Sequence, residues 1–177
     1  MTPGTLNGFV TQFGESFVGE GANAAHINTV LGSKGGPVET AWVSALAHPT
    51  QGHTPFVVAL QPGLAVKPFT LFVNKATIAG TRHAELTWGA AQAGVAKGVT
   101  DAVAEGIIAA AATDELLLIA AVWVDPIAAA AQLVFANNAR ATFAALQAGS
   151  RRLPPVEDAL AARHAPFNAF FRAPTGD

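Results

Sequence analysis

Apolar and polar residues alternate along two neighbouring segments near the start of the chain. Residues 8–18 are rich in Phe, Val and Thr, and the glycine-rich residues 19–23 follow them as a turn. In residues 24–31 the alternation places one set of side chains on each face: Ala25, Ile27, Thr29 and Leu31 against His26, Asn28 and Val30. The pattern predicts two consecutive strands, with His26 and Asn28 facing the same side.

The next segments predict one helix and two further strands. Residues 32–36 are a glycine-rich connector, and Pro37 then begins a predicted helix that ends near residues 48–49. Residues 54–60 and 68–78 have the apolar, β-branched and aromatic composition of strands, with a Gln-Pro-Gly turn between them.

A long helix and a central strand are predicted in the second half of the chain. Residues 81–107 carry an apolar residue at every fourth position from Val95 to Ile107, which is typical of a helix face. Because glycine is a poor helix former, we expect a kink or break around residues 88–90. The apolar run 116–124 predicts the central strand.

The last predicted helix begins with Asp125 and Pro126 as N-cap and first-turn pair, and it ends near residue 148 before Gly149. The predicted order is therefore β-β-α-β-β-α-β-α. That order predicts an α/β fold of the α+β sandwich type, in which helices pack on a mixed sheet. We assign residues 1–149 to a single domain, and residues 150–177 to a tail that is either loose or docks on another subunit.

The composition adds an expectation about assembly. Of the 177 residues, 51% are hydrophobic and 12% are charged, whereas about a quarter charged is usual for a soluble domain. This apolar surplus predicts a homo-oligomer in which subunit contacts cover part of the surface. The net charge of −2, with Lys and Arg scattered along the chain, argues against a nucleic-acid partner.

Several other functional classes lack their sequence signals. The longest apolar run has nine residues, about half of the ~20 that a membrane-spanning helix needs. Residues 1–8 do not resemble a secretory signal, so we expect a cytoplasmic protein with no membrane partner. The chain has no cysteine, which excludes disulfides, thiolate metal sites and cysteine nucleophiles.

Familiar catalytic motifs are also missing from the sequence. The glycines around Lys34 lack the spacing of a phosphate-binding loop, so an ordinary loop is expected there. His48 and His53 lie five residues apart in a segment broken by Pro and Gly, and no third ligand is near, so no metal site is expected. A Gly-x-Ser-x-Gly nucleophile motif does not occur.

Three polar residues remain as candidates, and each has an ordinary structural interpretation. His26, between two glycine-rich loops, is either a general acid or base or part of a solvated strand face. Lys75 interrupts an apolar strand, which is typical of an edge strand protected against aggregation. Gln92, among Ala and Gly, either contacts a ligand or caps an interface between small residues.

Seven short strings resemble the formaldehyde-activating enzyme family. They are GESFVGEG at 14–21, AHI at 25–27, GGPVETA at 35–41, KPFTL at 67–71, NKATI at 74–78, AQAGVA at 91–96 and DAVAEGII at 101–108. The last string is the most specific. The resemblance runs from about residue 14 to residue 148 without large gaps, and the remaining residues match poorly.

The resemblance implies a fold and an activity. Proteins of this family condense formaldehyde with tetrahydromethanopterin to methylene-tetrahydromethanopterin and water, in one-carbon metabolism and formaldehyde detoxification. Their fold is similar to domain 2 of ribosomal protein S5, and five subunits form a ring with the pterin in a cleft between neighbours. The resemblance therefore implies a lyase with a reduced pterin as co-substrate, no metal, and a homopentamer.

The resemblance also implies roles for individual residues. His26 occupies the position of the family's general acid, which protonates the departing oxygen of the carbinolamine. The implied substrate-binding positions are Asn28, Val57, Lys75, Thr77 and Gln92. Val57 replaces a Leu that usually lines the site.

Two departures from the family pattern change the expected chemistry. Asn28 replaces the usual Asp, and Ala93 replaces the usual His after Gln92. An amide forms hydrogen bonds but carries no charge to orient an amine or to support a neighbouring cation. These departures, with Ala90 in place of a Pro, indicate a divergent paralogue. A pterin-binding or formaldehyde-sensing protein without turnover, or an enzyme for another small carbonyl, stays open as an alternative.

Overall fold

The computed structural model describes residues 9–168 and 171–172. Its centre is a five-stranded mixed sheet of order β1-β2-β7-β6-β3. The strands are β1 (Gln12–Val18), β2 (Ala25–Ser33), β3 (Phe56–Val57), β6 (Phe69–Asn74) and β7 (Leu116–Trp123). Neighbours run antiparallel except β6 and β7, which are parallel.

The β1–β2 hairpin confirms the predicted alternation. In β2 the four residues expected on the inner face are buried, and His26, Asn28 and Val30 between them are partly exposed. The buried residues are Ala25, Ile27, Thr29 and Leu31. The alternation suits this strand because α3 and α4 cover one of its faces, whereas the other face is covered only in part. β7 is the middle strand, as the apolar run 116–124 predicted.

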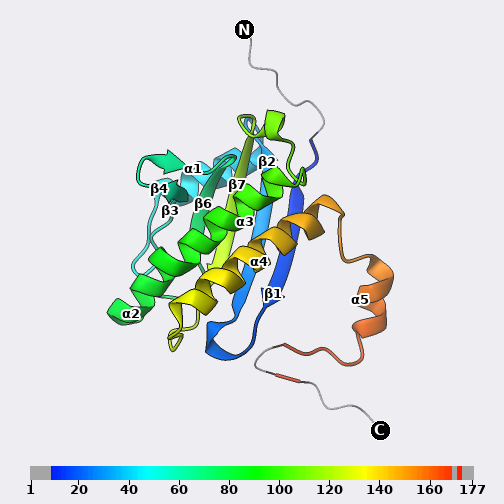
Figure 1. Cartoon of the computed structure of the whole chain (residues 1–177). Coiled ribbons are helices and arrows are strands. Elements are labelled where there is room, and N and C mark those ends of the chain that lie inside the picture. The colour runs from blue at the N-terminus through cyan, green and yellow to red at the C-terminus, as the bar shows by residue number, and fades with distance from the viewer. Residues whose placement is uncertain (1–8, 169–170, 173–177) are drawn as a thin grey trace.

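Two long helical segments cover one face of the sheet (Figure 1). The first consists of α2 (Gly80–Glu85), a π-helical turn (Leu86–Ala91) and α3 (Gln92–Ala104). The second is α4 (Ala131–Ser150), which packs against α3, β1 and β2. The predicted break at 88–90 is therefore a π-helical turn, and the helix ends at Ala104, before the predicted end at residue 107.

Glycines allow α4 to lie close to its neighbours. A Cβ on Gly98 would lie 2.6 Å from the Ala139 carbonyl oxygen, and one on Gly14 would overlap the Ala145 carbonyl. Because real Cβ atoms do not approach backbone oxygens so closely, only glycine permits this packing of α4 on α3 and β1.

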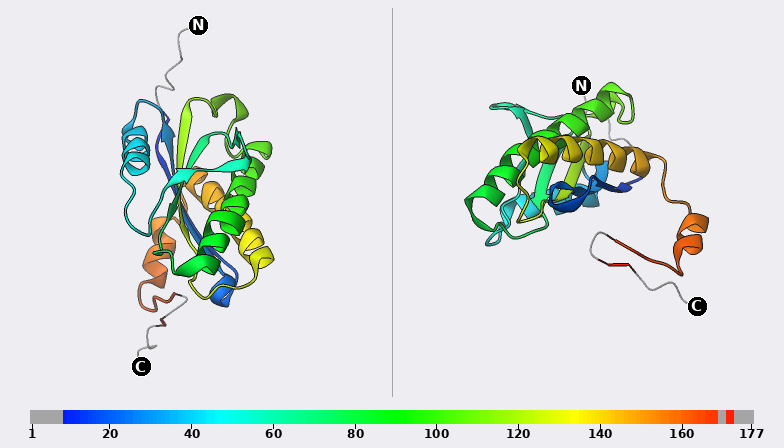
Figure 2. Two further views of the ribbon diagram at one scale, coloured as in Figure 1. Left: turned by 90° about the vertical axis from the view of Figure 1, so that its left-hand side faces the viewer. Right: turned by 60° about the horizontal axis from the view of Figure 1, so that its bottom comes forward.

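Helix α1 (Pro37–Ala47) covers part of the opposite face, so the left view of Figure 2 shows the sheet between α1 and the α3–α4 layer. It begins at Pro37, as predicted. Its Val38 is buried over Gly32 of β2. The rest of this face, near the β1–β2 turn, stays open. We call this uncovered area the open face.

The remaining elements are short. A small hairpin pairs β4 (Ala59–Gln61) with β5 (Leu64–Ala65), and 3-10 turns occupy Gly21–Asn23 and Ala110–Ala112. Helix α5 (Val156–Ala162) lies on an arm that leads away from the body (Figure 1). No helix in the described part of the chain is long and apolar enough to cross a membrane.

The fold class is confirmed, since helices pack on a mixed sheet, but several predicted elements are wrong in detail. The predicted strand 54–60 is replaced by β3, which pairs with β6, and β4, which pairs with β5. Val58 lies between them, where its N–H donates to the Thr70 carbonyl and its carbonyl accepts from the Val66 N–H. The β4–β5 hairpin and α5 add to the predicted order of elements. Residues 1–8 of the predicted domain, and 169–170 and 173–177 of the predicted tail, lie outside the described residues.

The predicted start of the last long helix at Asp125 and Pro126 is wrong. Asp125 caps only a local turn, in which its Oδ1 accepts from the Ile127 N–H at 2.9 Å, and α4 begins at Ala131. The Asn23 side chain accepts from the N–H groups of Ala129 and Ala130, just before α4. Gly149 lies within α4 instead of ending it, and it packs against β1 at a point where a Cβ would lie 3.1 Å from the Phe13 carbonyl oxygen.

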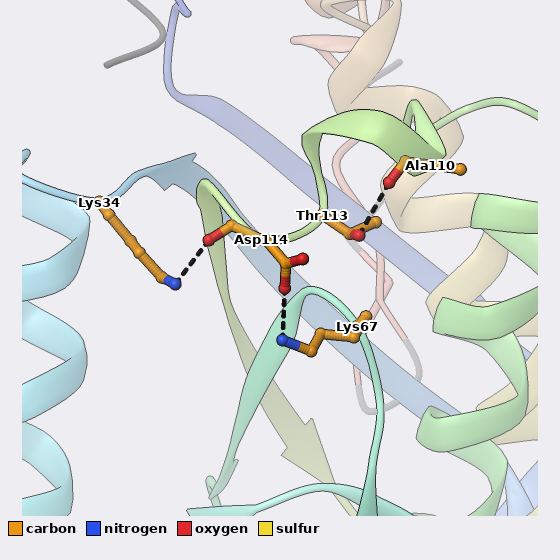
Figure 3. A network of polar contacts seen from close by, with 5 residues as sticks. All are labelled: Lys34, Lys67, Ala110, Thr113 and Asp114. Atoms are coloured by element: carbon orange, nitrogen blue, oxygen red, sulfur yellow. Dashed lines mark hydrogen bonds and ion pairs between the residues drawn. The ribbon is translucent and has the colours of Figure 1, made fainter. Parts of the chain in front are cut away.

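A polar network joins three loops at the end of the sheet far from the β1–β2 turn (Figure 3). Lys34 donates to the Asp114 carbonyl, and Lys67 pairs with the Asp114 carboxylate. The hydrogen bond and charge of Lys67 lower the pKa of Asp114. Lys34 is thus used in a loop contact, which agrees with the ordinary-loop interpretation of the glycines around it.

Candidate active site

The open face of the sheet contains a hollow of about 310 Å³. It is lined by Phe17, His26, Asn28, Lys75 and Trp123. The registers of β1, β2 and β7 set Phe17, His26 and Trp123 beside one another across the sheet. The hollow therefore combines aromatic walls with an imidazole, an amide and an amine.

His26 is oriented by a carboxylate from the neighbouring strand. Its Nε2 lies 3.0 Å from Oε1 of Glu15, and 37% of its side chain is exposed, so the ring is held while solvent still reaches it. The ring of Phe17 packs beside it, with centroids 6.1 Å apart and planes at 52°. An imidazole held in this way can exchange a proton with a bound molecule and with water.

Glu15 was missed by the sequence analysis, although a signal existed. The period-2 pattern of β1 puts Glu15 on the same face as Phe13 and Phe17, and its register partner is Asn28. Extending the alternation argument from β2 to β1 would have identified the carboxylate as a neighbour of His26.

Lys75 reaches into the hollow from the end of β6. Its backbone N–H donates to the Val122 carbonyl at 2.8 Å, and its Nζ donates to Oδ1 of Asn28, also at 2.8 Å. Burial lowers the pKa of Lys75, whereas the charge of Glu15 acts in the opposite direction. The edge-strand interpretation of Lys75 is wrong, because β6 lies between β7 and β3 and Lys75 follows its last residue.

The other three predicted residues do not line this hollow. Nδ1 of His53 donates to the Asn74 carbonyl at 2.8 Å, and Nε2 of His53 shares a hydrogen bond with the Thr77 hydroxyl at 3.1 Å. Gln92 accepts from the Ala59 N–H at 2.8 Å through Oε1. Val57 belongs to β3, opposite Leu71. The structure thus brings together His26, Asn28 and Lys75, but not the whole predicted set.

A larger hollow of about 650 Å³ lies elsewhere, between residues 9–13 and the end of α4. Its lining has Arg152 as its one ionisable side chain, with neither His nor a carboxylate. It therefore offers no acid or base for catalysis. Within the described ranges 9–168 and 171–172, no three His, Asp or Glu side chains gather to hold a metal ion.

Comparison with known proteins identifies the family. The profile of the formaldehyde-activating enzyme (Fae) family matches residues 13–171. The chain belongs to this family. It is 40% identical to the 5,6,7,8-tetrahydromethanopterin hydro-lyase of Methanosarcina barkeri (strain Fusaro / DSM 804) over 157 residues, which cover 89% of this chain and 88% of that protein.

Some longer proteins match this chain of the formaldehyde-activating enzyme family over only part of their own length. The Bifunctional enzyme Fae/Hps of Archaeoglobus fulgidus is 37% identical over 159 residues, which cover 90% of this chain and 40% of that protein. The protein of the same name from Methanosphaera stadtmanae is 36% identical over 152 residues, which cover 86% of this chain and 37% of that protein. The family resemblance drawn from short strings is thereby confirmed.

Proposed function

We propose that this protein condenses formaldehyde with tetrahydromethanopterin to methylene-tetrahydromethanopterin and water, with His26 as general acid. The observation that carries the proposal is the imidazole of His26, held by Glu15 at 3.0 Å and facing a hollow on the open face. The name of the Methanosarcina barkeri relative, a tetrahydromethanopterin hydro-lyase, supports the same substrate.

The chemistry needs one proton at one oxygen. Formaldehyde adds readily to a secondary amine, and the slower step is the loss of the hydroxyl group from the resulting carbinolamine. The protonated ring of His26 donates to that oxygen, the C–O bond breaks, and water leaves. The second amine of the pterin then attacks the iminium carbon and closes the ring, and the proton that this amine loses restores the protonated imidazole of His26, which Glu15 keeps oriented.

We also propose that the pterin is held by residues from two subunits. One subunit supplies hydrogen bonds from Asn28 and Lys75 in the hollow. The adjoining subunit supplies Val57, Thr77 and Gln92. Because these three do not line the same hollow, a site between copies of the chain accommodates all of them. The family resemblance supports this arrangement and a ring of five subunits.

The exposed apolar surface supports assembly. On the open face, 67% of Phe13 and 45% of Phe17 are exposed, and the arm after α4 exposes Leu153, Val156 and Leu160. Surfaces of this kind are usual at subunit contacts. We therefore propose that the arm docks on a second subunit. We also propose a cytoplasmic location, and the family resemblance supports roles in one-carbon metabolism and formaldehyde detoxification.

A second candidate function is a pterin-binding protein without turnover. It is favoured by Asn28, which gives Lys75 a neutral partner where the family usually has Asp, and by Ala93. Under this alternative the paired change Asn28→Asp and Ala93→His raises turnover sharply. A double variant no faster than the parent protein argues that these two positions did not cost the activity.

The test of the proposed function is a rate measured above background. Purified protein is mixed with formaldehyde and tetrahydromethanopterin, and product formation is compared with the spontaneous reaction, while direct titration measures pterin binding. Acceleration with saturable binding supports the enzyme. Binding without acceleration supports the second candidate, and a protein that does neither contradicts both.

A further inference from the structure

We propose that Lys75 captures formaldehyde covalently before the pterin does, so that its side-chain amine carries the one-carbon unit within the hollow. This inference rests on the proposed function for the acceptor and for His26 as the acid, and it places the carbinolamine that His26 protonates on Nζ of Lys75 instead of on the pterin amine. The observations that carry it are the placement of Nζ in the hollow, the neutral amide that holds it, and the nearby acid.

The geometry aims a single amine at the space where formaldehyde must enter. Nζ of Lys75 donates to Oδ1 of Asn28 at 2.8 Å, and both side chains line the hollow together with His26. An amide oxygen accepts a hydrogen bond from a neutral amine as well as from an ammonium group. The partner of Lys75 therefore does not require it to be charged.

The charged and titratable groups around the hollow are few. His26 on β2 lines the hollow and Glu15 on β1 lies against it, while the lining residues other than His26 and Lys75 carry no charge. Burial lowers the pKa of Lys75 more strongly than the charge of Glu15 raises it. The neutral, nucleophilic form of this amine is thus more abundant near neutral pH than for an ordinary lysine.

The other three lysines of the chain have different surroundings. Lys67 pairs with the carboxylate of Asp114, and Lys97 pairs with that of Asp101 at 2.6 Å. Lys34 donates to the Asp114 carbonyl in the same network (Figure 3). Lys67 and Lys97 in particular are exposed and paired with carboxylates, whereas the amine of Lys75 is partly buried and bonded to a neutral amide. They are internal controls for the reactivity of Lys75.

The capture step balances in atoms and charge. The lone pair of Nζ attacks the formaldehyde carbon, a C–N bond forms, the C=O π bond opens, and the ammonium proton passes to the oxygen to give a carbinolamine. The imidazolium of His26 then protonates the hydroxyl group, the C–O bond breaks, and water leaves an iminium ion on Nζ.

Transfer to the acceptor follows by amine exchange. A pterin amine attacks the iminium carbon, which forms a second C–N bond. After a proton moves to Nζ, the bond between that carbon and Nζ breaks and returns Lys75 as an amine. The one-carbon unit leaves on the pterin, with no oxidant or reductant required. Holding both amines at one carbon supplies the advantage of proximity.

The test labels lysines without any pterin. The full chain is exposed briefly to dilute isotopic formaldehyde with cyanoborohydride, which reduces the iminium ion to a methylamine, and peptide mass spectrometry gives the initial rate at each lysine. At pH 7 we expect Lys75 to be labelled about threefold faster or more than Lys97 and Lys67, because labelling follows the neutral amine. The advantage should shrink as the pH rises toward 10.

Asn28→Asp provides the matched variant. A carboxylate at this position keeps the hydrogen bond but raises the pKa of Lys75, so labelling of Lys75 should slow while that of Lys97 and Lys67 stays unchanged. Equal labelling of Lys75 and Lys97 at pH 7, or no effect of Asn28→Asp, overturns the inference. If the protein gives either of these labelling results but still accelerates pterin condensation, the proposed function stands and only the covalent step is excluded.

Discussion

The two faces of the central sheet differ in the helices that cover them and in the side chains that they carry. Under α3 and α4 the inner face is closed, and side chains such as Ile27, Leu118 and Ala120 are fully buried. On the open face, Glu15 of β1 and His26 and Asn28 of β2 alternate with buried residues of their own strands and reach solvent. The fold is therefore stabilised by one face of β2, which leaves the other face free to carry polar groups for chemistry.

This comparison predicts that changes on the two faces have separable effects. Substitutions on the covered face should change the free energy of unfolding, and conservative substitutions on the open face should change activity.

The largest effect is expected on the covered face, for Gly14→Ala. The added Cβ would overlap the Ala145 carbonyl of α4, so the helix must shift or β1 must separate from it. We expect a loss of about 3 kcal/mol or more in the free energy of unfolding, measured by urea denaturation. Gly89→Ala is the matched control, because nothing lies within 4 Å of its Cβ, and it should not destabilise the fold. Equal losses in both variants would contradict the packing argument.

Gln92 tests whether a residue implied to bind pterin also supports the fold. Its Oε1 accepts from the Ala59 N–H, so Gln92→Ala leaves that donor unpaired and should cost about 1–2 kcal/mol of unfolding free energy. Gln92→Glu keeps an acceptor and should retain most of the stability. If Gln92→Ala unfolds like the parent protein, the hydrogen bond to β4 does not stabilise the fold.

Glu15→Gln tests the orientation of His26 on the open face. The amide keeps a polar partner for Nε2 but loses the charge, so we expect turnover to fall by about threefold to tenfold while thermal stability stays unchanged. The change also removes the charge that raises the pKa of Lys75, so that pKa should fall further. The pH dependence of Lys75 labelling should then move to lower pH, and a move to higher pH would contradict this assignment.

The smallest effect on the protomer is expected from removal of the arm. Every described residue of α5 is exposed, so a chain ending at Ser150 should unfold within about 0.5 kcal/mol of the full chain when both are compared as protomers. Its oligomeric state, measured by light scattering after size-exclusion chromatography, should be smaller or less stable to dilution. An unchanged oligomer would contradict the proposed docking role of the arm.

Much of the scaffold could be predicted from local patterns. The alternation in β2 and the apolar run of β7 are visible in the sequence because burial on one face or on both forces their composition. The start of α4 could not be predicted in the same way. Asp125 is a good helix cap by type, but it caps a separate turn, and the Asn23 side chain from a distant loop meets the N–H groups before α4.

The candidate site was only partly predictable for a similar reason. His26 and Asn28 share a strand, so their common face follows from period 2. The contact between Asn28 and Lys75 joins residues 47 positions apart and depends on β7 lying between β2 and β6. The hydrogen bonds of Thr77 to His53 and of Gln92 to β4 are likewise set by tertiary structure, which composition and spacing do not reveal.

The most direct test of the central claim compares His26→Gln with the parent protein in the pterin condensation assay. Histidine 48, at the exposed end of α1, provides the matched control His48→Gln. We predict that acceleration above the spontaneous rate falls about 100-fold in His26→Gln, with pterin binding and thermal stability retained, and that it is unchanged in His48→Gln. Full acceleration by His26→Gln would contradict the assignment of the open face as the catalytic face.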